Sequence, residues 1–194
     1  PPRTNPHRRA GGGKIAPMDN QLPTGVDVVV AAQTLGSTIR RTPLDMSLRL
    51  SGIRNQDILL KREDIQVGRS YKARGAYNFI SSLSADEREA GVVCASAGNH
   101  AQGVAFACRQ LKIHAKVFLP STTPRQKRAR IADIGGRWIE QIIVGATFDE
   151  ASAAAQEHAR EHGATYVHPF DDPRTIAGQG TVVKEIFEQA SEPP

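Results

Sequence analysis

The sequence contains little cysteine, and it lacks any long apolar run. Its 194 residues include only Cys94 and Cys108, and both lie within apolar segments. This pattern does not resemble a disulfide framework or a cysteine-based metal site, and no secretory signal precedes it. No stretch approaches the roughly 18 apolar residues that a membrane-spanning helix needs. We therefore expect a soluble, cytoplasmic protein with both cysteines in its core.

Acidic residues are missing from positions 1–17, which contain Arg3, Arg8, Arg9 and Lys14. The formal net charge of the chain is +5, so most of the excess positive charge belongs to this segment. The remaining body is nearly neutral, which argues against a surface that follows nucleic-acid phosphates. The basic run at 125–130 is more typical of a solvated helix face. We predict neither a nucleic-acid nor a membrane partner.

Periodicity is also absent from residues 1–23, which are rich in Pro, Gly and Arg. We predict a disordered basic tail there. Met18 fits either an ordinary position in a flexible extension or the native start, and the sequence leaves both open. Residues 26–35 then predict an apolar helix, and residues 58–60 predict a short buried strand.

From Gly91 onward, short apolar runs alternate with helical patterns. Such alternation predicts right-handed crossovers and a parallel sheet with flanking helices, which is an α/β fold. The predicted strands are 92–95, 115–119, 138–144 and 164–167, and the predicted helices between them are 101–111, 125–133 and 148–162. Gly178 and Gly180 flank the predicted start of a final helix, 182–188, where they could simply permit a tight turn, but we assign this motif to domain packing.

One lysine stands at an unusual position in this pattern. Lys72 follows a polar loop and opens a helical run, with Tyr71 directly before it. An amine that forms a Schiff base with an aldehyde needs a desolvated site, and an aromatic neighbour and a helix start both favour one. An exposed first-turn lysine is the other interpretation, and the short motif alone leaves both open.

A second stretch, Ser96-Ala-Gly-Asn-His-Ala-Gln-Gly103, follows the strand predicted at 92–95. It predicts the carboxyl end of a strand that leads into a helix N-terminus, where free backbone N–H groups bind anions. Asn99 could equally be an ordinary helix N-cap. A reactive amine and an anion-binding turn on one chain indicate amino-acid chemistry.

Four motifs in order resemble those of threonine dehydratase, a pyridoxal-phosphate enzyme of the tryptophan-synthase-β-like fold, called fold type II. They are Ser70-Tyr-Lys-Ala-Arg-Gly-Ala76, Ser96-Ala-Gly-Asn-His-Ala-Gln-Gly103, His168-Pro-Phe-Asp-Asp172 and Ala177-Gly-Gln-Gly-Thr181. The resemblance extends from about Thr42 to Glu188. It implies pyridoxal 5'-phosphate as cofactor, an amino-acid substrate, and a homo-oligomer for the full-length protein.

The resemblance also implies roles for particular residues. Lys72 would bind the cofactor covalently and then act as the general base. Tyr71 would pack on the cofactor ring, and Asn99 would lie beside its phenolic oxygen. The substrate carboxylate would be received by the backbone of Ser96, Ala97, Gly98, Asn99 and His100. Arg74 is more typical of a structural ion pair, and we do not expect it to take part in catalysis.

The implied reaction converts L-threonine to 2-oxobutanoate and ammonia, with L-serine as a poorer substrate. This is the first step of isoleucine biosynthesis, although the sequence does not distinguish that role from threonine breakdown. A serine racemase-like enzyme is the main alternative, because it shares the lysine motif and the asparagine loop. Cysteine synthase fits less well, because it usually has an acid where this chain has Ala73 and a threonine where this chain has His100.

Two other patterns are rejected. Gly98 and Gly103 have the spacing of P-loop glycines, but Val104 follows where that loop needs lysine. His158 and His162 match a zinc-peptidase pattern, but no third ligand is evident.

We predict a small parallel-sheet domain at 91–167, inserted into a partial large domain made of 24–90 and 168–194. The family's glycine-rich loop for the cofactor phosphate is not found in this sequence. We therefore expect an incomplete large domain. A catalytically incomplete fragment that acts only with a partner chain is the alternative to an active enzyme.

Overall fold

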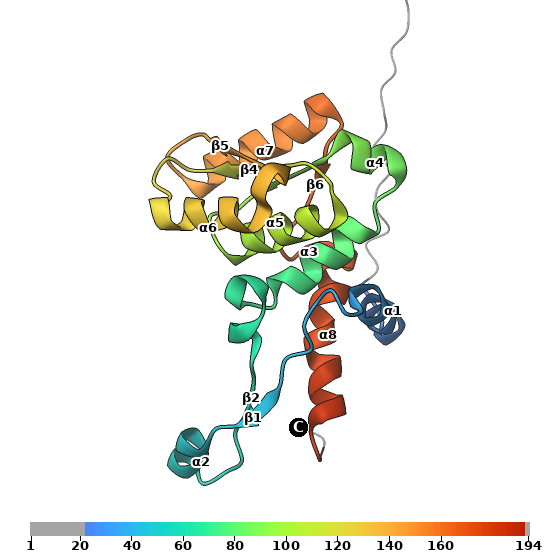
Figure 1. The fold of residues 1–194 in the computed structure, drawn as a ribbon, viewed down its shortest axis with the longest axis vertical. Helices are drawn as coiled ribbons and strands as arrows, with labels where there is room; N and C mark the ends of the chain where they lie inside the picture. The colour runs from blue at the N-terminus through green and yellow to red at the C-terminus, as the bar shows by residue number, and fades with distance from the viewer. Residues whose placement is uncertain (1–21, 193–194) are drawn as a thin grey trace, which may run out of the picture.

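The computed structural model describes residues 22–192 (Figure 1). Apart from Leu22 and Pro23, our predicted disordered tail lies outside the described residues, and so does the question of Met18 as the start. No helix in the described part of the chain is long and apolar enough to cross a membrane.

A four-stranded parallel sheet forms the upper half of the molecule in Figure 1. Its order is β5-β4-β3-β6, with each strand parallel to its neighbour. The strands are β3 (Val92–Ala95), β4 (Ala115–Leu119), β5 (Ile139–Ile143) and β6 (Thr165–Tyr166). The predicted parallel sheet is confirmed, with β3 and β4 at the predicted bounds. β5 begins one residue later than predicted because Gly136–Trp138 forms a 3-10 turn.

Alternate residues of the strands face two different helical layers, as the period of two in a strand requires. Val92 and Cys94 belong to a core that includes residues of α5 (Asn99–Leu111) and α6 (Arg125–Gly135). Val93 belongs to a second core with residues of α7 (Phe148–His162). Figure 1 shows α7 above the sheet and the other two helices below it. The sheet is thus buried on both faces.

Both cysteines lie in the first of these cores, as predicted. Burial raises the pKa of the Cys94 thiol to about 12 and raises that of Cys108 as well. Both thiols are therefore protonated near neutral pH and contribute as small apolar side chains.

Two helices connect the sheet layers to the lower half of the molecule. α3 (Lys72–Ser81) packs on α5 above and on α8 (Pro173–Gln189) below (Figure 1). α8 packs very closely on α3 at Gly178. A Cβ at this position would lie only 2.7 Å from the Arg74 carbonyl oxygen, so a larger residue would not fit. Gly178 is therefore a contact point between two helices.

Our prediction for the start of α8 is wrong. The helix begins at Pro173, with Asp172 as its N-cap, so Gly178 and Gly180 lie inside it. The Asp172–Pro173 pair is itself a typical helix start, and we gave the glycines more weight than this signal. Gly178 lies in close contact with α3 and Gly180 with the Val28 side chain, so these glycines serve packing, as we assigned them, and form no turn.

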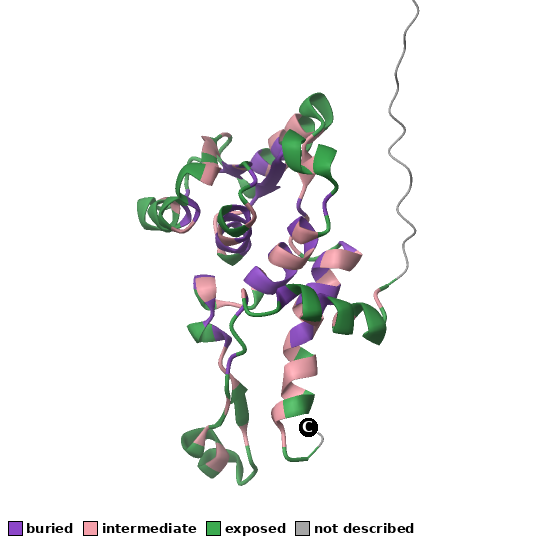
Figure 2. Ribbon diagram, turned by 45° about the vertical axis from the view of Figure 1, so that its right-hand side comes forward, coloured by how far each residue is buried: buried purple, intermediate pink, exposed green. Residues whose placement is uncertain are grey.

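The lower half contains the remaining elements. They are α1 (Gly25–Leu35), β1 (Leu44–Met46), α2 (Leu48–Arg54), β2 (Leu59–Lys61) and the 3-10 turns Glu63–Ile65 and Val67–Arg69, while α4 (Ala85–Ala90) leads from α3 to the sheet. β1 and β2 form an antiparallel ribbon that projects with α2 away from the sheet (Figure 1). The two halves differ in burial. Buried segments, drawn in purple, concentrate around the sheet and α3, whereas the β1–β2 ribbon is mostly exposed (Figure 2).

Buried charged side chains connect the ribbon with α3 and α8. Arg74 is fully buried and donates to Glu63 at 2.7 Å and to Glu185 at 2.7 Å. Lys61 adds a third link, with its amine 2.6 Å from Glu185 and 2.6 Å from the Thr42 carbonyl oxygen. The prediction that Arg74 is a structural ion-pair partner is confirmed. The division of the chain into a small domain at 91–167 and a partial large domain remains a prediction.

Candidate functional site

Lys72 begins α3 in a fixed backbone geometry. Its own N–H donates to the Ser70 hydroxyl at 3.1 Å, just after the 3-10 turn that ends at Arg69. A Cβ on Gly103 of α5 would lie 2.9 Å from the Lys72 carbonyl oxygen, so the start of α3 is in close contact with α5. The loop before Lys72 and the absence of a side chain at Gly103 thus allow Lys72 to lie directly against α5.

The Lys72 amine is half-buried and bonded to the backbone. Nζ donates to the carbonyl oxygen of Pro169 at 2.8 Å and lies 5.3 Å from the centroid of the Tyr71 ring. Burial lowers the pKa of the amine, and none of the ion pairs among residues 22–192 includes it. A lowered pKa raises the neutral, nucleophilic fraction of the amine near neutral pH.

The turn at Ser96–His100 joins the carboxyl end of β3 to the first turn of α5. Gly98 is the N-cap, and its N–H donates to the Ser96 hydroxyl at 3.1 Å. The first N–H groups of a helix have no partner within it, and the helix dipole adds positive potential there. Asn99 is exposed and is the first helical residue, so the simple N-cap interpretation of Asn99 is wrong. Ser96, Ala97 and Gly98 are partly accessible.

His100 is buried at the same turn. Its Nε2 lies 2.9 Å from the Val167 carbonyl oxygen, while its Nδ1 has no hydrogen-bond partner among the described residues. Burial is the main cause that lowers the pKa of His100 to about 4, and the positive charge of Lys72 adds to it. The ring is therefore neutral near pH 7.

The segment Val167–Pro169 brings the two motifs together. Directly after β6, the Val167 carbonyl meets the His100 ring and the Pro169 carbonyl meets the Lys72 amine. His168, between them, accepts at Nδ1 from the N–H of Asp171 at 2.7 Å, which folds the loop back on itself. These two carbonyl acceptors could not be predicted from the sequence, because a backbone acceptor leaves no signal in the pattern of side chains.

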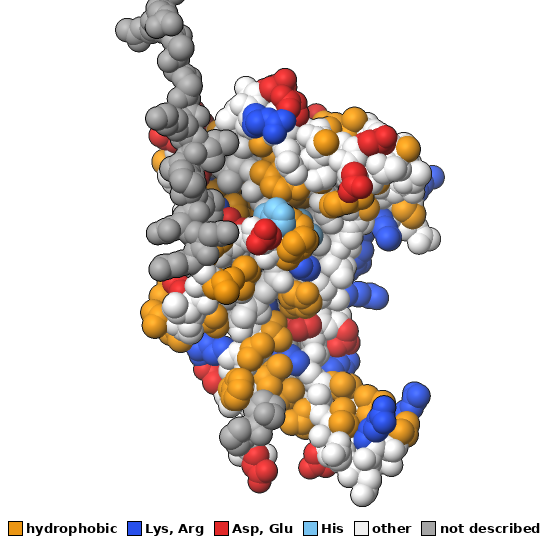
Figure 3. All heavy atoms as spheres, turned by 180° about the vertical axis from the view of Figure 1, so that it is seen from behind, with side chains coloured by type: hydrophobic (Ala, Val, Ile, Leu, Met, Phe, Trp, Pro, Cys, Tyr) orange, Lys and Arg blue, Asp and Glu red, His pale blue; other side chains and the backbone are white. Residues whose placement is uncertain are grey.

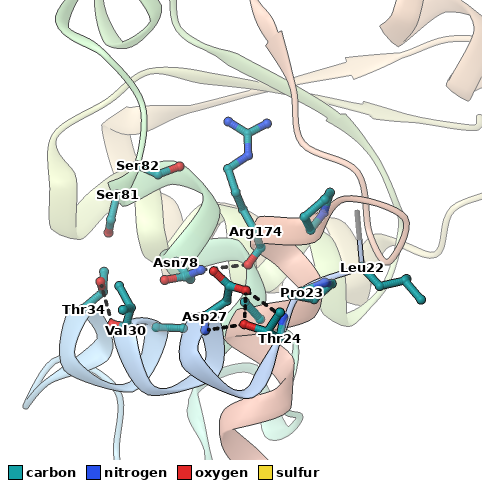
Figure 4. Close-up of a pocket in the computed structure, with 13 residues that line it drawn as sticks. Leu22, Pro23, Thr24, Asp27, Val30, Thr34, Asn78, Ser81, Ser82 and Arg174 are labelled. Carbon is teal, nitrogen blue, oxygen red and sulfur yellow. Dashed lines mark hydrogen bonds between the residues drawn. The ribbon is translucent and has the colours of Figure 1, made fainter. Parts of the chain in front are cut away.

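Another groove of the described chain lies away from this site. It has a volume of about 390 Å³ and lies where α1, α3 and α8 meet (Figure 4). Several of its polar groups are bonded within the protein: Thr24 and Asp27 form a capping box, and the Asn78 amide donates to the Arg174 carbonyl at 2.8 Å. The buried Ser81 hydroxyl has no partner among the described residues. This groove includes neither Lys72 nor the turn at Ser96–His100, so it is not the candidate site.

The rejected zinc pattern has a different geometry from a metal site. The rings of His158 and His162 stack with their centroids 4.0 Å apart. Within residues 22–192, no group of three His, Cys, Asp or Glu side chains is arranged to hold a metal ion.

Comparison with known proteins extends over most of the chain. The family model described as "Pyridoxal-phosphate dependent enzyme" matches residues 35–194. The chain belongs to this family. A biosynthetic L-threonine dehydratase, IlvA, of Mycobacterium bovis is 52% identical over 171 residues, covering 88% of this chain and 40% of that protein. The Bacillus subtilis IlvA is 47% identical over 176 residues, covering 91% of this chain and 42% of that protein.

Solved structures of the pyridoxal-phosphate family share the fold. The processed threonine deaminase isoform 2 of Solanum lycopersicum matches with a TM-score of 0.78 and 39% identity, covering 89% of this chain and 51% of that one. Maize serine racemase matches with a TM-score of 0.83 and 30% identity, covering 89% and 51%. The predicted fold type II class is confirmed. The chain spans about half the length of these structures and about 40% of the curated relatives.

The residues at the site fit the family's cofactor chemically. Pyridoxal phosphate offers an aldehyde to an amine, and Lys72 has a lowered pKa without a carboxylate that would hold its proton. An amino acid linked to the cofactor carries a carboxylate, and the first turn of α5 offers free N–H donors. The aromatic ring of Tyr71 is beside the amine and 42% exposed, so it is accessible to a planar group.

Proposed function

We propose that this chain supplies the lysine and the carboxylate-binding turn of a pyridoxal-phosphate-dependent L-threonine dehydratase. The observation that supports it most directly is the shared contact of Lys72 and His100 with the single segment Val167–Pro169. The 52% identity to the Mycobacterium bovis enzyme supports L-threonine as substrate. The word "biosynthetic" in the names of the relatives supports a role in isoleucine synthesis.

In this proposal, four parts of the site have separate tasks. Lys72 would hold the cofactor through its amine, Tyr71 would pack against the ring, and Asn99 would be placed beside the ring's phenolic oxygen. The backbone N–H groups from Ser96 to His100 hold the substrate carboxylate, which fixes the orientation of the α-carbon. When bound, the cofactor draws electron density away from that carbon.

Lys72 then acts as a base. When its amine is free of the cofactor, Lys72 would take the proton from the α-carbon, and the β-hydroxyl would leave as water with one proton, so that the net loss is one water molecule. In the proposed overall reaction, L-threonine is thereby converted to 2-oxobutanoate and ammonia. The lowered pKa of Lys72 supports this role, because a base must be unprotonated at the working pH.

The test is turnover of L-threonine in the presence of pyridoxal phosphate, measured as 2-oxobutanoate. Lys72→Ala should abolish the activity, whereas Lys112→Ala, at an exposed position on the far end of α5, should leave it unchanged. Activity that survives in Lys72→Ala would contradict the assignment. Formation of D-serine from L-serine faster than 2-oxobutanoate from L-threonine would favour the racemase alternative.

A second candidate is that the chain turns over substrate only with further polypeptide. Exposed apolar side chains support it, and Figure 3 shows patches of them on the lower half of the molecule seen from behind. Val26 is 71% exposed on α1, and Phe187 is 59% exposed on α8. Restoration of activity by the C-terminal part of a relative, added as a second chain, would favour this candidate. We propose the cytoplasm as location and a homo-oligomer for the full-length protein.

A further inference from the structure

The carbonyl oxygen of Pro169 accepts two hydrogen bonds. One comes from Lys72 Nζ at 2.8 Å and the other from Gln179 Nε2 at 3.2 Å. A carbonyl oxygen has two lone pairs, so both donors can be satisfied together. The two nitrogens are at most 2.8 Å plus 3.2 Å, about 6 Å, apart. The Gln179 amide is therefore a direct neighbour of the Lys72 amine.

Gln179 is held in place by the packing of α8 on α3. A Cβ on Gly75 would lie 2.9 Å from both Cγ and Nε2 of Gln179, so the glutamine side chain covers the backbone of α3 at Gly75. Gly75 is three residues after Lys72 and is buried. The amide is thus confined between two helices, and its donor direction is set by the fold.

The same face of α8 fixes the neighbouring carbonyl. Thr175 is one turn before Gln179, and its buried hydroxyl donates to the His168 carbonyl oxygen at 3.1 Å. Residues four apart on a helix share a face. α8 therefore holds two consecutive carbonyls of the loop after β6, and only the second also accepts from Lys72.

We propose that Gln179 is a positioning residue that holds the Pro169 carbonyl at the Lys72 amine and thereby sets the position from which this amine reacts. The proposal rests on the proposed function, in which Lys72 is the residue that binds the cofactor. Gln179 itself does not touch the substrate. Its amide acts through one backbone oxygen.

The test measures the reactivity of Lys72 without cofactor. The purified chain is acetylated with a trace of acetic anhydride at a series of pH values, and each lysine is quantified by mass spectrometry. Lys112 and Lys127 are exposed and serve as internal references. Because no cofactor is present, the result does not depend on whether the chain turns over threonine.

Two variants should shift Lys72 in opposite directions. Gln179→Glu places a carboxylate within about 6 Å of the amine, which stabilises the ammonium. We expect acetylation of Lys72 to slow about tenfold at neutral pH, which corresponds to a rise of about one pKa unit. Gln179→Met removes the donor without adding charge. The Pro169 carbonyl is then free to swing away from the amine, and we expect Lys72 to react about twofold faster.

The control is Gln156→Glu, which adds the same charge at an exposed position on α7. It should leave Lys72 unchanged. The proposal is overturned if Lys72 reacts at the wild-type rate in a folded Gln179→Glu or Gln179→Met chain, as judged by near-UV circular dichroism. It is also overturned if both variants shift the rate in the same direction, because general loosening would do that. If Gln179 behaves as expected but pyridoxal phosphate does not label Lys72, then the proposed function fails and the positioning contact stands.

Discussion

The sheet region and the lower half of the molecule are stabilised in different ways. Around the sheet, apolar side chains are buried on both faces, and His100 is buried as a neutral ring. In the lower half, buried charges join the elements, and large apolar side chains remain exposed on α1, α8 and the β1–β2 ribbon. Lys72 lies where the two regions meet, at the start of the helix that packs against both. Its position therefore depends on each of them.

Among the substitutions that test this difference between the regions, Arg74→Met should cause the largest loss in the free energy of unfolding. The substitution leaves Glu63 without its cation and Glu185 with Lys61 alone, and breaking such a buried pair costs about 3–5 kcal/mol. Arg41→Met is the matched control, because its ion pair with Glu188 is exposed and should contribute far less. Urea unfolding followed by circular dichroism measures both. Equal, small losses would mean that the buried charges do not hold the lower half together.

The next largest effect should be on the pH dependence of stability, because the buried His100 of the sheet region and the ion cluster of the lower half titrate in different pH ranges. The folded-state pKa of His100 is about 4, below the ordinary value of 6.5, so the unfolded chain binds a proton there that the folded chain does not. The stability that comes from burying His100 as a neutral ring is fully present above pH 6.5 and is lost as the pH falls towards 4. His100→Gln should flatten the pH dependence of urea unfolding in this window. An unchanged slope would contradict the burial of a neutral ring.

The ion cluster should respond at lower pH. The hydrogen bonds from Arg74 and Lys61 outweigh burial and lower the pKa of Glu185 below its ordinary value of 4.5. Its contribution is present above pH 4.5 and is lost as the pH falls further.

The smallest effect on stability should come from Phe187→Ser. This side chain is 59% exposed on α8, and exposed substitutions change the free energy of unfolding by roughly 0.5 kcal/mol or less. An exposed apolar face does favour association, so the variant should shift sedimentation towards the monomer. Gln156→Ser on the polar face of α7 should leave sedimentation unchanged. A large loss of stability would show that Phe187 is part of a core.

The sequence predicted the sheet region well and the lower half less well. Strands such as β4 are short apolar runs between helices with clear periodicity, so local pattern was sufficient. α8 was misplaced because two glycines inside a helix were interpreted as its start, and their role depends on α3, about 100 residues earlier in the chain. Helix-to-helix contacts of this kind have no local signal.

The candidate site divides in the same way. Lys72 and the turn at Ser96–His100 could be found from motifs, and Arg74 was assigned correctly as an ion-pair residue. The partners of these residues could not be found. The Lys72 amine meets a carbonyl 97 residues later in the chain, and the geometry depends on α8 as much as on β6. Sequence supplied the reactive groups, and only the fold supplied their acceptors.

The most direct measurement is labelling of the chain with pyridoxal phosphate, followed by borohydride reduction and peptide mapping. Our account predicts that the label is concentrated on Lys72 and that Lys72→Ala loses it, while Lys112→Ala retains it. Labelling spread over the exposed lysines, with Lys72 no higher than Lys112 and Lys127, would contradict the claim that the two regions together build a site around Lys72.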